Sequence, residues 1–302
     1  MSMNKSVYIG TSGWSYPSGA GNWKGSFYPR RWSGDELTYY AERFPAVEVN
    51  SSFYRIPSAE AARGWVERTP DGFQFTVKLY RKFTHPEFFA REEGKSAEIT
   101  PEDVAGMRLV LDTLAERGRL GAVLLQYPDF YTKTNAHVTA LVRTMDYFRD
   151  YPLAVELRNR SWEQPETVDI LQHFRATGVR IDEPFLCTLD DPPVSRAMQY
   201  WRLHGRNTEW WSKPGAGNRR YDYLYTKDEI DELAEKIRRY MTPDGSKFVF
   251  FNNHPGGKAP TNAVELASRL HFDLPYHKFA NLADSFPELR PITGGAGGQL
   301  EL

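Results

Sequence analysis

The sequence predicts an α/β fold, a single (β/α)8 TIM barrel, on three observations. Eight short apolar runs alternate with longer amphipathic segments along most of the 302 residues, and this alternation is typical of a parallel sheet whose strands are joined by helices. The glycine-rich fingerprint of a dinucleotide-binding sheet is incomplete, since residues 10–13 lack its third glycine. Barrels of this class often form one domain of about 250 residues. We therefore predict one domain over residues 1–290 and a flexible, glycine-rich tail over residues 291–302.

The eight predicted strands are the short apolar runs. They cover residues 7–10, 46–52, 73–80, 122–127, 153–158, 179–182, 199–204 and 247–252.

Seven helices are predicted between the strands from their capping residues. Ser-x-x-Glu at 33–36 is a capping box that opens a helix to about residue 44, and Thr-x-x-Glu at 226–229 opens another to about residue 240. The remaining helices are predicted at residues 58–69, 100–118, 134–148, 165–177 and 260–270. The Pro-rich link over 183–198 is too short for a good helix, so one βα unit is predicted to be degenerate.

Composition excludes several classes of protein. The net charge of −1 lacks the strong basic signature of a dedicated nucleic-acid binder. The single cysteine, Cys187, excludes an internal disulfide and Cys-based metal sites, which fits a reducing cytosol. No run approaches the roughly 18 apolar residues of a membrane span, and the first ten residues contain no signal-peptide core. We expect a cytoplasmic protein without membrane association, and its oligomeric state is left open.

Strand periodicity gives the main prediction about function. Side chains alternate between the two faces of a strand, and the outward face of a barrel must be apolar to pack on helices. The polar side chains should then point inward near the carboxyl ends of the strands, where barrel enzymes build their sites. The residues predicted to meet at this mouth are Glu48, Asn50, Lys78, Gln126, Glu156, Arg158, Asp182, Arg202, His204 and Asn252.

The charges in this set also allow a purely structural interpretation. Three acids and three bases balance formally, so they could form a self-satisfied network of ion pairs that fills the barrel. We keep this alternative beside the functional one.

Loops at the same mouth supply further candidates for binding. After the last strand, Asn253 precedes a turn with Gly256, Gly257 and Lys258 at a helix N-terminus, which is a recipe for an anion site. Arg206 follows the seventh strand and is predicted to complete that site. Aromatic side chains interleaved with basic residues, among them Trp14 and Tyr54, either stack on a ligand or pack as a lid.

No cofactor is required by the sequence, but a divalent metal remains an option. Its ligands would be Glu156, Asp182 and His204, at neighbouring strand ends. No local metal-binding motif supports this alternative.

Several ordered motifs resemble those of the YecE-like proteins, also called the domain of unknown function 72 family. They are YIGTSGWSY at 8–16, VEVNSSFY at 47–54, FTVK at 75–78, LQYP at 125–128, VELR at 155–158, RLHG at 202–205 and FNNH at 251–254. The resemblance covers nearly the whole chain and implies a TIM barrel related to xylose isomerase and endonuclease IV. It implies no agreed activity. Two positions depart from the family pattern, Tyr127 and Asn159.

The first hypothesis for function is an enzyme, of hydrolase or isomerase and lyase type, that acts on a small phosphate-bearing or otherwise anionic substrate. Lys78, Arg158 and Arg202 would neutralise the anion, Glu156 would be the general base, and Asp182 or His204 the paired acid. Glu48 and the loop residues named above would bind substrate. The alternatives are a metal-dependent phosphodiesterase acting on nucleic acid, by analogy with endonuclease IV, and a non-catalytic ligand-binding barrel.

Overall fold

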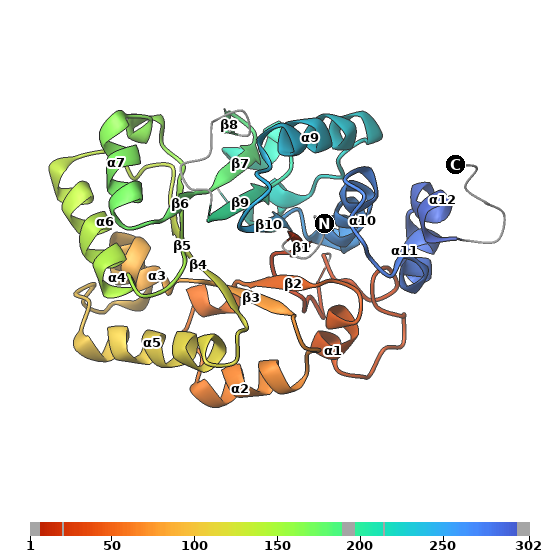
Figure 1. Cartoon of the computed structure of the whole chain (residues 1–302), viewed down its shortest axis with the longest axis horizontal. Helices are drawn as coiled ribbons and strands as arrows, with labels where there is room; N and C mark the ends of the chain where they lie inside the picture. Colours follow the sequence, from red (N-terminus) through yellow and green to blue (C-terminus); the bar gives the residue numbers. More distant parts are fainter. Residues whose placement is uncertain (1–6, 20, 189–196, 214, 295–302) are drawn as a thin grey trace.

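The computed structural model describes residues 7–19, 21–188, 197–213 and 215–294 (Figure 1). Within them, strands form two five-stranded sheets, in the orders β1-β10-β9-β7-β8 and β2-β3-β4-β5-β6, and all their pairings are parallel except that of β7 with β8. The strands are β1 (Val7–Thr11), β2 (Ala46–Val49), β3 (Gln74–Lys78), β4 (Leu120–Tyr127), β5 (Leu153–Leu157), β6 (Thr177–Gly178), β7 (Arg180–Glu183), β8 (Leu186–Cys187), β9 (Met198–Leu203) and β10 (Ser246–Phe251).

Two seams close the sheets into a barrel. At the first, Ser12 forms a parallel bridge with Glu48, and the Gly13 amide donates to the Glu48 carbonyl at 2.8 Å. At the second, β6 pairs with β5 while β7 pairs with β9, and only Val179 separates β6 from β7. The predicted (β/α)8 barrel is therefore confirmed, with β6 and β7 together in the place of one strand.

Helices surround the barrel at the places that the sequence predicts (Figure 1). The seven expected helices are α1 (Glu36–Ala41), α2 (Ala59–Glu67), α5 (Pro101–Ala115), α6 (Asn135–Tyr147), α7 (Pro165–His173), α9 (Lys227–Tyr240) and α10 (Lys258–Arg269). The capping box at Thr226 and Glu229 is present. The box predicted at 33–36 is wrong, because Asp35 is the N-cap and accepts from the Thr38 amide.

Short helices that periodicity could not show lie in the loops. They are α3 (Arg81–Thr84), α4 (Pro86–Glu93), α8 (Thr208–Trp211), α11 (Ala280–Ser285) and α12 (Arg290–Thr293). Helix α12 continues three residues into the segment predicted to be a flexible tail, and residues 295–302 lie outside the described part of the chain.

The degenerate βα unit lies between β7 and β9. Strand β8 pairs with β7 in the antiparallel direction there, and residues 189–196 are not among those described. No helix in the described residues is long and apolar enough to cross a membrane.

The core has an outer and an inner part. Alternate strand residues such as Val49, Val77 and Trp201 pack outward with the helices. A smaller inner cluster, which includes Leu124, Ile181 and Phe250, fills the barrel below the mouth. Because the interior is filled, the polar side chains at the carboxyl ends of the strands lie directly above a packed apolar core.

Candidate functional site

A pocket of about 490 Å³ opens at the carboxyl ends of the strands. Three cationic side chains line it, those of Lys78, Arg158 and Arg202. The rest of the lining is aromatic, amide or small: Gly13, Trp14, Ser15, Tyr16, Asn50, Ser51, Phe53, Tyr54, Gln126, Asn218, Tyr221, Asn252 and His254. No Asp or Glu of the described residues is part of this wall.

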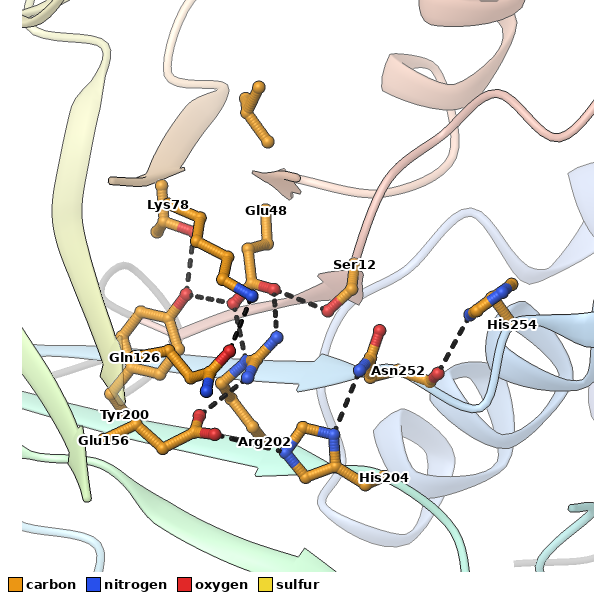
Figure 2. Close-up of polar contacts among 12 residues, drawn as sticks. Ser12, Glu48, Lys78, Gln126, Glu156, Tyr200, Arg202, His204, Asn252 and His254 are labelled. Carbon is orange, nitrogen blue, oxygen red and sulfur yellow. Dashed lines mark hydrogen bonds and ion pairs between the residues drawn. The ribbon is translucent and has the colours of Figure 1, made fainter. Parts of the chain in front are cut away.

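Beneath the pocket, Arg202 joins two buried carboxylates (Figure 2). Its Nε and one Nη donate to the two oxygens of Glu48 at 2.9 and 2.7 Å, and the other Nη donates to Glu156 Oε2 at 2.7 Å. Glu48 also accepts from Ser12 Oγ and the Tyr200 hydroxyl, each at 2.7 Å. Burial acts to lower the pKa of Arg202, but the two carboxylates overcome it and raise that pKa. Arg202 is thus a fixed positive charge at the floor of the pocket.

Each carboxylate oxygen of Glu156 accepts a hydrogen bond from an arginine. Arg158 Nε donates to its Oε1 at 2.5 Å, and Arg202 holds its Oε2. Burial acts to raise the pKa of Glu156, but Arg158 and Arg202 lower it well below its usual range. Because each oxygen already accepts from a guanidinium, Glu156 is poorly placed to take a proton from a substrate. The predicted role of general base does not fit this geometry.

His204 is fully buried and stays neutral. Its Nδ1 lies 3.0 Å from Asn252 Nδ2, and its Nε2 lies 3.7 Å from Glu156 Oε1 (Figure 2). The same Nε2 lies 3.0 Å from an Arg158 nitrogen. Burial, followed by the charge of Arg158, lowers the pKa of His204 to about 3. A neutral imidazole has one acceptor nitrogen, so His204 accepts a hydrogen bond from either Arg158 or Asn252 and not from both.

Lys78 has a different environment from the two arginines. Its Nζ donates to Gln126 Oε1 at 2.7 Å and lies 4.0 Å from the centre of the Phe53 ring. Among the described residues it forms no ion pair with a carboxylate. Burial, together with the positive charges of Arg202 and Arg158, lowers the pKa of Lys78 to about 7. The pocket therefore holds an amine that is partly neutral near neutral pH.

Asp182 does not face the mouth, so the prediction that it lies among the inward residues is wrong. Its carboxylate accepts from Arg206 at 3.0 Å and from the Tyr225 hydroxyl at 2.7 Å, on the outer side of the barrel. Arg206 also pairs with Glu229 and Glu232 of α9. The physical reason is that Ile181 belongs to the inner cluster, which turns its neighbour outward.

Glu183 occupies the inward position that Asp182 was expected to take. Its Oε2 lies 3.5 Å from an Arg158 nitrogen, and burial raises the pKa of this carboxyl to about 7. The sequence signal for it was the same alternation, counted from an inward Ile181.

The glycine-rich turn before α10 lies apart from the pocket. Gly256 N donates to the Gly21 carbonyl at 3.1 Å, and a Cβ on Gly257 would lie 2.5 Å from Ser26 Oγ. These glycines therefore let the turn pack against the N-terminal loop. Lys258 pairs with Asp222.

The position of another loop residue, Asn253, also differs from the prediction. The Asn253 side chain donates to the Tyr223 carbonyl and to Asn262, behind the mouth. Tyr221 and Asn218, which also line the pocket, are not among the residues that the sequence predicts for the site.

The donors for a divalent metal are not assembled. No group of three or more His, Cys, Asp or Glu in the described residues could hold an ion. Of the predicted set, Asp182 faces outward and Glu156 is neutralised by two guanidinium groups. The predicted ligands therefore do not fit a bound divalent metal ion.

Residues 8–281 match the sequence model of a family described as "Protein of unknown function DUF72". The chain belongs to the DUF72 family. A relative in the family, UPF0759 protein YunF from Bacillus subtilis, is 30% identical over 280 residues, which cover 88% of this chain and 95% of that protein. UPF0759 protein YecE from Escherichia coli is 33% identical over 79 residues, 26% of this chain and 25% of that one.

Solved DUF72 structures have the same fold. The crystal structure of a DUF72 protein from Enterococcus faecalis matches with a TM-score of 0.76 and 25% identity, covering 88% of this chain and 96% of that one. One from Thermotoga maritima matches with a TM-score of 0.72 and 32% identity, covering 88% and 99%. These relatives confirm the family and the fold that the sequence motifs predict.

Proposed function

We propose that this DUF72 protein is an enzyme that acts on a small anionic substrate, such as a phosphate-bearing metabolite, at the mouth of the barrel. The observation that carries the proposal is the charge of the pocket wall. Lys78, Arg158 and Arg202 line it, and no described carboxylate does. The acids that balance these cations lie below or behind them, so the pocket presents the positive side of the network to a ligand.

The three cations have different tasks in this proposal. Arg202 is held by Glu48 and Glu156 and supplies a fixed charge at no cost of reorganisation. Arg158 keeps one guanidinium nitrogen 3.5 Å from Glu183 and is 11% exposed, so it can donate to an anion. Lys78 adds an ammonium when protonated. Charge-assisted hydrogen bonds of this kind are the strong ones for phosphate and carboxylate.

The chemistry needs a group that exchanges a proton near neutral pH. A general base works best when its pKa is close to the operating pH. Lys78, with a pKa of about 7, replaces Glu156 in that role. Hydrolysis and isomerase or lyase chemistry both use such a group, and the pocket supports either.

The two alternatives have separate expectations. A metal-dependent phosphodiesterase needs a donor set, which the described residues do not assemble. A non-catalytic barrel would bind anions without turning any of them over.

The test is calorimetric titration with a panel of phosphorylated and carboxylated metabolites, each followed by product analysis. We expect binding that is weakened about ten-fold or more in Arg158→Gln, the loss of one charged hydrogen bond. Lys258→Gln is the matched control, because it removes a cation from the glycine-rich turn outside the pocket, and should bind like the parent. Equal binding by Arg158→Gln, or weakening by Lys258→Gln alone, would move the anion site to the turn. Binding without any product would favour the non-catalytic barrel.

A further inference from the structure

The side chain of Lys78 is unusual among the cations of the pocket because it has no anionic partner in the part of the chain that the structure describes. Its Nζ donates to a neutral amide oxygen, Gln126 Oε1, and faces the ring of Phe53. Figure 2 shows the amine beside Gln126, above the ion pairs of Arg202. An amine fixed by a neutral acceptor keeps its nitrogen available to a ligand, whereas one held by a carboxylate would remain an ammonium.

The surroundings of Lys78 favour the neutral amine. Burial is the largest cause that lowers the pKa of Lys78. The charges of Arg202 and Arg158, which line the same pocket, act in the same direction and outweigh the opposite effect of Glu156 and Glu48. A lysine next to other cationic groups in a desolvated pocket is the arrangement that activates an amine as a nucleophile.

From this geometry we propose that Lys78 is a nucleophile that forms an imine with an aldehyde or ketone substrate, whose anionic group is held by Arg158 above the fixed charge of Arg202. The inference rests on the proposed anion site and names the substrate class, a small carbonyl compound that carries a carboxylate or a phosphate. Gln126 is a positioning residue that aims the amine.

The covalent step balances without an outside oxidant or reductant. The lone pair of the neutral Nζ forms a bond to the carbonyl carbon, while the π electrons of the C=O bond move to oxygen. The two protons of the amine leave with that oxygen as one water, and a C=N bond remains. Once protonated, the imine withdraws electrons from the adjacent carbon, which permits proton loss or carbon–carbon cleavage there.

The test uses pyruvate and dihydroxyacetone phosphate as probes, which present a carboxylate and a phosphate respectively. Each is incubated with the full-length protein and sodium borohydride, which reduces an imine to a stable amine. Intact mass and peptide mapping then locate the adduct. We expect one main adduct, on Lys78, whose formation accelerates as the pH rises through about 7. Sulfate should compete with it, and acetone, which lacks an anionic group, should label about ten-fold more slowly or less.

Matched variants complete the design. Lys78→Arg keeps the positive charge but cannot form the imine, and should lose the adduct. Lys258→Gln should label like the parent. If Lys78→Arg does not fold, the peptide map of the parent protein decides alone. Labelling spread over surface lysines, or none at Lys78, would overturn the inference.

Different results would reject the anion site and the imine on Lys78. Sulfate or metabolite binding that is lost in Arg158→Gln, without any adduct on Lys78, would leave the anion site intact and reject the imine. The absence of anion binding would reject the proposed function itself.

Discussion

At the scale of single residues, the mouth of the barrel contains two kinds of charged side chain. Some are fully paired with opposite charges, and others keep hydrogen-bonding capacity for a ligand. Glu48, Arg202 and Glu156 satisfy one another, so the structural interpretation of the charged set holds for these three. Lys78 lies outside that network, with an amide as its hydrogen-bond partner. The functional interpretation therefore depends on Lys78 and on the exposed edge of Arg158.

The first prediction concerns the cost of burying Lys78. Its pKa is lowered to about 7 from an ordinary 10.5, so between these values the unfolded chain holds a proton that the folded protein does not. The free energy of unfolding consequently rises with pH across that window, and the destabilising effect of Lys78 is largest below pH 7. Lys78→Met should stabilise the protein more at about pH 6 than at about pH 9, with a difference of about 2–3 kcal/mol.

Urea denaturation at the two pH values measures this difference. Lys82→Met is the control, since Lys82 pairs with Asp103 outside the pocket. A stability change in Lys78→Met that is the same at both pH values would contradict the lowered pKa.

The second prediction concerns anion affinity. Sulfate keeps its charge through neutral pH, whereas Lys78 loses a proton and Glu183, beside Arg158, gains a negative charge as the pH rises through about 7. His85, His204 and His254 stay neutral, with pKa values lowered to about 3, 3 and 4. Sulfate binding should therefore weaken several-fold, about one charge interaction, between pH 6 and 8. The double variant Lys78→Met and Glu183→Gln should bind with no such pH dependence in calorimetry.

The orientation of Asp182 could not be predicted from the sequence. The sequence contains the alternation, but not which face of the sixth strand points inward. That choice depends on Ile181, which was predicted to face outward as an apolar residue but packs in the inner cluster. A barrel interior is filled with side chains in layers, so an apolar residue can face in, and shifting the assignment by one residue exchanges Asp182 for Glu183.

At the scale of elements, the turn before α10 shows a sequence signal with two physical meanings. Glycines before a helix either bind an anion or permit close packing. In this protein Gly257 has a φ of +90° and no room for a Cβ beside Ser26. Sequence alone cannot separate these meanings, because the N-terminal loop that contacts the turn lies more than two hundred residues away.

The third prediction follows from that contact. Gly257→Ala should lower the free energy of unfolding by about 1–3 kcal/mol, because it adds both backbone strain and a clash. Sulfate affinity of the folded variant should stay unchanged. Thermal denaturation and calorimetry check the two parts, and Gly94→Ala, whose Cβ meets open space but whose φ is also positive, separates strain from clash. A large loss of sulfate affinity in Gly257→Ala alone would restore the turn as the anion site.

At the scale of the whole molecule, the ion network ties distant strands together. Glu48 comes from β2, Glu156 from β5 and Arg202 from β9, so the buried charges connect the two sheets across the barrel. The barrel was predictable because local signals, the eight apolar runs and the helix caps, agree with the global fold. Its closure through β6 and β7 was not, since a break at a single residue leaves no mark on periodicity.

The fourth prediction tests that connection. Glu48→Gln removes one of the two carboxylates that balance the buried charge of Arg202. This change should lower the free energy of unfolding by about 3–5 kcal/mol. Glu166→Gln, which breaks the exposed pair with Lys133, should change it by about 1 kcal/mol or less. Urea denaturation of both variants measures the contrast, and equal effects would show that the network does not hold the sheets together.

Anomalous diffraction of crystals soaked in selenate, a dianion visible through its selenium, would locate the anion site of the protein directly. We expect the strongest peak in the mouth pocket, within hydrogen-bond distance of Lys78 and Arg158, and its loss in crystals of Arg158→Gln. A peak at Gly256–Lys258 instead, or a pocket without selenate while other sites are filled, would contradict this expectation.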